Sequence, residues 1–148
     1  MRQELQNKII IKYGEIFSDY WDKSTPINPM VFGIECDDGW FDIINTSMHE
    51  IAKYAQSHFP LGFTIRQVKE KFGSLDIYTS HSDEVIHNIC MDAKIESYKT
   101  CEVCGTKENV GMTKGWFKTI CKDCYEISHL KKIGKKWDTE SIYKNFEK

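Results

Sequence analysis

The sequence has little proline, few glycines and no long apolar run. Its 148 residues include 3 Pro and 9 Gly, which excludes collagen-like and low-complexity chains. No apolar stretch approaches the roughly 20 residues that a bilayer-spanning helix needs. The run Ile9–Ile11 is flanked by Lys8 and Lys12 and lacks the cleavage site of a signal peptide. We therefore expect a soluble, cytoplasmic protein with no membrane partner.

Familiar catalytic motifs are also missing. The chain has no G-x-x-x-x-G-K-[ST] phosphate loop, no G-x-G-x-x-G, no H-E-x-x-H and no G-x-S-x-G. Asp37, Asp38 and Asp42 precede His49, as in an acid–base cluster. However, the aspartates stand at the start of a predicted helix, where capping and the helix dipole account for them. We expect a protein that is not an enzyme and predict no catalytic residue.

The charge is distributed unevenly along a chain of ordinary composition, with 41% hydrophobic and 28% charged residues. Residues 1–100 carry 10 basic and 15 acidic side chains, whereas residues 101–148 carry 10 basic and 7 acidic ones. This asymmetry indicates two parts with different surfaces. We predict an α+β domain over residues 1–99, a four-Cys zinc module over 100–127, and a Lys-rich C-terminal extension over 128–148.

Apolar residues at three- and four-residue steps predict the helices of the first domain. One helix is expected from Met1 to Asp22, interrupted only at Gly14, and a second from Gly39 to Ser57. A third begins at Ser82 or Asp83, either of which can cap it. Weaker helical patterns follow near the C-terminus, over 125–134 and 141–146.

Residues 63–79 differ from the helical segments because apolar and polar side chains alternate on both sides of a turn candidate at 72–74. This pattern predicts a β-hairpin. A competing interpretation takes Ile65, Val68 and Phe72 as one stripe of a helix. The preferred fold class is α+β, with helices packed on a small hairpin and a C-terminal zinc ribbon-like module.

Four of the 6 cysteines fall in two C-x-x-C pairs, Cys101/Cys104 and Cys121/Cys124, with 16 residues between the pairs. Each tight turn can direct two thiolates at one ion, and Gly105 suits a turn that needs positive φ. Four thiolates leave no open coordination position, so the predicted zinc is structural. An iron–sulfur cluster or a redox dithiol is the alternative.

The zinc module also carries the best candidates for contact with a partner. Trp116, Phe117, Lys118 and Lys122 interleave aromatic and basic side chains, and Trp137 extends this edge. Such a surface fits a protein partner, and it also fits nucleic acid, where lysines neutralise phosphates and rings stack on bases. The segment lacks arginine, the residue best suited to reading guanine, so a protein partner is preferred.

Three strings in this order resemble a set of small phage and prophage proteins that end in a zinc ribbon-like module. The strings are Asp38-Gly39-Trp40-Phe41, then Gln67-Val68-Lys69-Glu70-Lys71-Phe72-Gly73-Ser74-Leu75 with Tyr78, then Cys101–Cys104, Gly115-Trp116 and Cys121–Cys124. The resemblance covers residues 36–125 and implies no catalytic residue. It implies a phage protein that acts in the bacterial host cytoplasm.

We therefore predict a zinc-stabilised binding protein that modulates a host protein, with inhibition of an anti-phage defence protein as a specific case. A DNA- or RNA-binding regulator that uses the zinc module is the first alternative. A small-molecule or nucleotide sponge is the second, and it requires a deep pocket with convergent polar groups. The sequence predicts no oligomeric state.

Overall fold

The computed structural model describes residues 1–24 and 27–143, and its helices and strands form two sheets with their covering helices. The first sheet has the order β1-β2-β3, with β1 parallel to β2 and β2 antiparallel to β3. Its strands are β1 (Ile34–Glu35), β2 (Ile65–Lys71) and β3 (Ser74–Thr79). The mixture of helix and sheet is consistent with the predicted α+β class.

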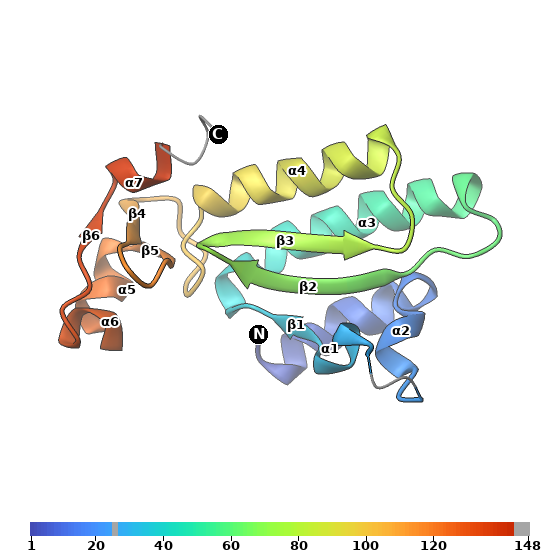
Figure 1. Ribbon diagram of the computed structural model, residues 1–148, viewed down its shortest axis with the longest axis horizontal. Helices are drawn as coiled ribbons and strands as arrows, with labels where there is room; N and C mark the ends of the chain where they lie inside the picture. Colours follow the sequence, from blue (N-terminus) through green and yellow to red (C-terminus); the bar gives the residue numbers. More distant parts are fainter. Residues whose placement is uncertain (25–26, 144–148) are drawn as a thin grey trace.

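Helices lie against this sheet and enclose the larger core (Figure 1). The main ones are α1 (Gln3–Lys12), α3 (Phe41–His58) and α4 (Glu84–Tyr98). Trp40, Ile44, Met48 and Ile51 along α3 and its entry are fully buried, as is Ile86 of α4. These positions repeat at three- and four-residue steps, so the apolar stripe expected from the sequence is the face that packs.

The N-terminal helix is shorter than predicted. α1 ends at Lys12 and is followed by a 3₁₀ turn, Gly14–Ile16, and a single helical turn, α2 (Ser18–Trp21). Ile16 and Phe17 still reach the core, with 3% and 0% exposure. The sequence predicted one helix interrupted only at Gly14, whereas the regular helix ends before this residue and does not resume over its predicted length. Glycine weakens a helix, and the buried contacts of Ile16 and Phe17 stabilise the shorter turns instead.

The prediction that Asp37 or Asp38 caps a helix is wrong. α3 follows a 3₁₀ turn, Asp38–Trp40, and neither aspartate makes a capping hydrogen bond. Asp38 instead accepts hydrogen bonds from Arg2. The capping prediction for Asp83 is confirmed, since its Oδ1 accepts from the backbone N–H of Ile86 at 3.0 Å.

The hairpin over 63–79 is confirmed, and the helical alternative is wrong. β2 and β3 pair from Lys71 opposite Ser74 to Ile65 opposite Thr79, with a shift of register between Ile65 and Gln67. The loop between the strands has only two residues, Phe72 and Gly73, and both have positive φ, at 52° and 84°.

The second sheet lies at the end of the molecule near the Phe72-Gly73 loop (Figure 1). Its order is β5-β4-β6, with β4 antiparallel to both neighbours. Its elements are β4 (Val110–Thr113), β5 (Thr119–Cys121), α5 (Lys122–Ile127), α6 (His129–Lys132), β6 (Trp137–Asp138) and α7 (Glu140–Tyr143). β6 comes from the segment predicted as a Lys-rich extension. Residues 144–146 of the last predicted helix lie outside the described residues.

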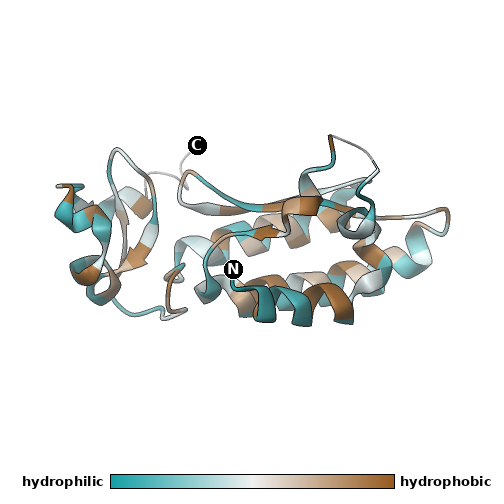
Figure 2. Ribbon diagram, turned by 90° about the horizontal axis from the view of Figure 1, so that it is seen from below, coloured by the Kyte–Doolittle hydropathy of each residue, from teal (hydrophilic) through white to brown (hydrophobic). Residues whose placement is uncertain are grey.

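The larger part and the cysteine-containing end of the molecule differ in the hydropathy of their residues. Brown, hydrophobic segments recur along the helices and strands of the larger part, whereas the small helices at the opposite end are largely teal (Figure 2). Within the part of the chain that is described, every helix is too short or too polar to cross a bilayer.

Candidate functional site

The four paired cysteines meet at one point. The Sγ atoms of Cys101, Cys104, Cys121 and Cys124 all lie within 4.8 Å of one another, and those of Cys104 and Cys121 are 3.7 Å apart. None of the four is in a disulfide. Cys101 and Cys121 are buried, and Cys104 is exposed. The predicted ligand set is therefore brought together in a geometry that could hold a metal ion.

Two local structures place these thiols. The first pair lies on a turn closed by two backbone hydrogen bonds, from Gly105 to Cys101 O at 2.9 Å and from Cys101 to Thr106 O at 2.8 Å. Gly105 has φ of +80°, as the sequence predicted for this position. The second pair lies at the start of α5, where Cys121 Sγ accepts from the backbone N–H of Cys124 at 3.4 Å.

The turn that carries the first pair is also fixed to the larger part of the molecule. Glu102 has a side chain only 3% exposed, and its Oε2 lies 2.7 Å from Lys118 Nζ. The same ammonium lies 2.8 Å from Asp37 Oδ2. Glu102 Oε1 accepts from the backbone N–H of Asp37 at 3.0 Å. Burial acts to lower the pKa of Lys118, but the charge of Glu102 and these hydrogen bonds outweigh it and keep that pKa above its usual value.

Gly39 and Trp40 complete this contact from the side of α3. Gly39 donates its N–H to Glu102 O at 2.7 Å. A Cβ at Gly39 would lie 2.2 Å from Cys101 O, so only glycine allows the two backbones to approach this closely. The fully buried Trp40 donates from Nε1 to Thr100 O at 2.9 Å.

A third contact comes from the β2–β3 loop. Thr119, at the start of β5, donates from Oγ1 to Gly73 O at 2.6 Å, and the bond is buried. We refer to Asp37, Gly39, Trp40, Gly73, Glu102, Lys118 and Thr119 together as the joint. Residues 38–41 and 67–75 thus both contact the segment that carries the cysteines, and these contacts connect the cysteine cluster to the first sheet. Sequence reasoning missed this role for Glu102, because a single glutamate beside a cysteine gives no signal of burial.

The residues predicted to contact a partner fall into two groups, those held by contacts within the protein and those exposed to solvent. Lys118 is held in the joint, with a side chain 19% exposed. Trp137 packs against Gly111, donates from Nε1 to Ile120 O at 2.8 Å and stacks on Tyr125. Lys122 Nζ lies 4.8 Å from the Trp137 ring centre. These contacts tie Trp137 and Lys122 into the module itself.

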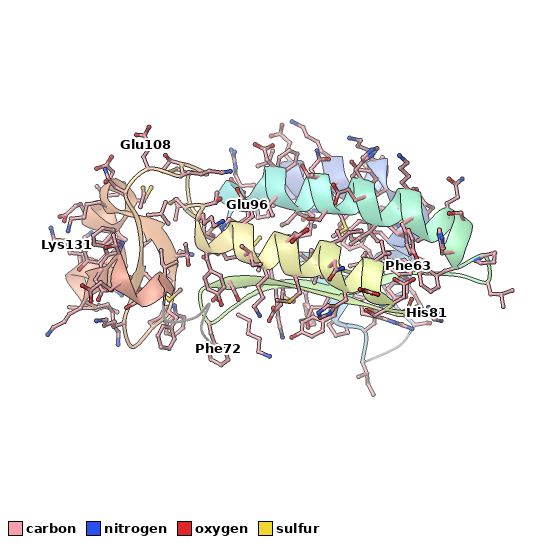
Figure 3. All side chains as sticks on the ribbon, turned by 90° about the horizontal axis from the view of Figure 1, so that it is seen from above. Phe63, Phe72, His81, Glu96, Glu108 and Lys131 are labelled. Carbon is pink, nitrogen blue, oxygen red and sulfur yellow. The ribbon has the colours of Figure 1, made fainter. Side chains whose placement is uncertain are left out.

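Trp116 and Phe117 are different, because they stand in the loop between β4 and β5 and remain 66% and 44% exposed. Phe72, in the β2–β3 loop, is 70% exposed and lies edge-on to Phe117 with ring centres 6.5 Å apart. Figure 3 shows Phe72 projecting from the end of the hairpin beside the module. We call Phe72, Trp116 and Phe117 the hairpin-tip patch. The sequence predicted a turn at 72–74, but it did not show that Phe72 is exposed in this turn while Gly73 is buried against the module.

The lysines of residues 100–127 are matched by carboxylates, as is Lys131, whereas Lys132, Lys135 and Lys136 have no ion pair among the described residues. The ion pairs of this region join Lys107 with Glu96, Lys114 with Asp138, Lys118 with Asp37 and Glu102, and both Lys122 and Lys131 with Glu126. Each pair removes positive charge that would otherwise attract phosphate.

The other candidates from the sequence lie apart from this site. Burial raises the pKa of Cys36 to about 12 and that of Cys90 to about 11, so both are protonated thiols at neutral pH. His49 lies exposed on α3, with its ring 6.4 Å from that of Tyr13. No family model, curated protein or solved structure matches the chain in comparisons with known proteins.

Proposed function

We propose that the protein binds a partner protein through the hairpin-tip patch, on a scaffold held by a structural zinc ion. Four thiolates at about 2.3 Å from one Zn²⁺ stand about 3.8 Å apart at the corners of a tetrahedron. The 3.7 Å between Cys104 Sγ and Cys121 Sγ supports this assignment. A site made of four cysteines has no position for water or substrate, which favours a scaffold role over a catalytic one.

The observation that carries the binding proposal is the backbone of Phe72. A bulky side chain at φ of +52° is an outlier, because the left-handed region costs an L-residue roughly 1–2 kcal/mol. Asn or Gly would fill this place in the loop without that cost. The phenylalanine also gains little from burial, since it is 70% exposed. Strain kept at an exposed aromatic favours a role in recognition rather than in folding.

The rest of the hairpin-tip patch supports the same function. Tryptophan and aromatic side chains dominate the binding energy of protein interfaces, and rigid placement reduces the entropy lost on binding. The Thr119–Gly73 hydrogen bond of 2.6 Å holds the two loops beside each other. In the phage context that the resemblance implies, the partner is a host protein, and a bacterial defence protein is the specific candidate.

Nucleic acid is the weaker alternative. A phosphate-binding surface needs unpaired cations, whereas Lys114, Lys118 and Lys122, the lysines around the aromatic edge, are each paired with a carboxylate. A salt titration on single- and double-stranded DNA tests this alternative directly, because retention through phosphates falls steeply as salt is added.

The decisive experiment replaces Phe72 by asparagine. F72N should fold with a melting temperature equal to or above that of the unchanged protein, because Asn tolerates positive φ. Affinity capture from bacterial lysate, read by mass spectrometry, should recover one partner protein with the unchanged chain, in an amount close to that of the chain itself. The same capture with F72N should not recover that partner.

The matched control is Ile11→Ser, which removes a side chain that is 70% exposed on α1, outside the patch. I11S should retain the partner. Recovery of the same protein by F72N at an unchanged level would contradict the assignment of the patch.

A further inference from the structure

A hollow of about 640 Å³ opens between the end of α1 and the C-terminal half of α3. Phe63 lines it, and Figure 3 places Phe63 at the end of the molecule away from Phe72 and the cysteine module. The hollow therefore shares no residue with the hairpin-tip patch. An inference drawn from it does not depend on the proposed function.

Small side chains create this space. Ala52 and Ala55, on the face of α3 toward the hollow, are 8% and 3% exposed. The rings of Phe59 and Phe63 form an aromatic wall, with their centres 5.4 Å apart. Two alanines and two phenylalanines make this part of the lining apolar.

Basic side chains stand at the rim. Lys12 comes from the last residue of α1, and Lys53 comes from α3, 41 positions later in the chain. Neither has an ion-pair partner among residues 1–24 and 27–143, whereas Lys8, one turn before Lys12, pairs with Glu4. The lining also includes the carboxylate of Glu15. The Nζ atom of Lys12 lies 4.9 Å from the ring centre of Tyr13, which leaves its charge unneutralised. Two lysines without an ion pair and one glutamate give the lining a positive balance.

We propose that this hollow binds an amphiphilic organic anion, a molecule with an apolar body and one anionic group. The apolar body lies against Ala52, Ala55 and Phe59, and the anionic group lies near Lys12 and Lys53. Sites for small ligands have volumes of about 300–1,000 Å³ and combine apolar walls with a few polar groups, as this one does. An acyl carboxylate has this chemistry, and a nucleoside monophosphate shares with it a single anionic group attached to a body that can pack on the aromatic wall.

The test is a titration of the full chain with 8-anilinonaphthalene-1-sulfonate, an aromatic anion that becomes fluorescent in apolar sites. Saturable binding is expected, with shifts of the Ala52 and Ala55 methyl signals in NMR spectra. Those signals distinguish the hollow from the hairpin-tip patch, where the dye could also bind. Displacement by dodecanoate identifies an acyl ligand, and displacement by AMP identifies a nucleotide.

The variant K12A/K53A should bind the dye about tenfold more weakly, because two exposed charge interactions are lost. Lys8→Ala is the matched control, since it removes a lysine of the same helix outside the hollow, and it should bind normally. Three results overturn the proposal: alanine methyl signals that do not move, a dye displaced by neither anion, or equal affinity in K12A/K53A and K8A.

Discussion

Lys118 Nζ lies 2.7 Å from Glu102 Oε2, in a pair that joins the loop before β5 to the cysteine turn and is almost closed to water. Asp37 brings the end of the first sheet's β1 segment to the same ammonium. A lysine that the sequence presents as a surface contact is thus part of the connection between the two sheets. This connection sets the orientation of the hairpin-tip patch, and it can be tested by substitution.

Removing Glu102 should destabilise the protein far more than removing Asp37. Glu102→Ala leaves Lys118 without its buried partner, and breaking such a pair costs about 3–5 kcal/mol. The Asp37 side chain is 52% exposed, so Asp37→Ala should cost at most about 1 kcal/mol. Urea unfolding of both variants measures the two losses. Equal losses would show that burial at the joint does not strengthen the pair.

Gly39→Ala should loosen the joint without removing any charge. The added Cβ would lie 2.2 Å from Cys101 O and 2.6 Å from Glu102 O, both backbone atoms that cannot rotate away. We expect a loss of about 3 kcal/mol in thermal or urea unfolding. Gly14→Ala is the control, since nothing lies within 4 Å of its added Cβ, and it should be neutral or slightly stabilising. A normal melting temperature for G39A would mean that the close approach is not required.

Asp83 should make α4 sensitive to acid. Its pKa lies below the usual 3.8, first because of the hydrogen bond from the Ile86 N–H and then because of that from Tyr54. A lowered folded pKa means that the contribution of Asp83 to stability is complete well above its unfolded pKa of 3.8 and is lost as pH falls through the folded pKa. Asp83→Asn keeps a capping oxygen and has no charge to lose.

The free energies of unfolding of the two proteins should therefore differ most at neutral pH and converge as pH falls below the folded pKa of Asp83. Any loss of the metal at low pH affects both proteins and cancels in the comparison. A difference that grows as pH falls would have the wrong sign for this assignment.

Metal removal should unfold the C-terminal third and leave the larger part intact. We expect about one zinc per chain by elemental analysis, which follows from four ligands to one ion. Cys104→Ser or chelation should abolish that content and make residues 100–143 sensitive to trypsin, because this small region depends on its metal. Cys90→Ser, which changes a cysteine outside the cluster, should keep the metal. A module that stays protected after complete chelation would remove the structural role.

The sequence by itself determined the local features of this protein. Apolar residues at three- and four-residue steps predicted α3 and α4, and the alternation of apolar and polar residues predicted the β2–β3 hairpin. The spacing of Cys101, Cys104, Cys121 and Cys124 predicted that four thiols lie together. Each signal lies within a short stretch of chain, where side-chain direction follows from backbone geometry.

Only the tertiary structure decided which residues meet across the chain. Asp37 and Lys118 are 81 positions apart, so no local pattern shows that the ammonium serves the joint. The hollow cannot be predicted from the sequence for the same reason, because its lining combines Lys12 of α1 with Lys53 of α3. Burial, pairing of charge and the shape of a cavity arise from contacts between distant segments, and those contacts exist only once the chain has packed.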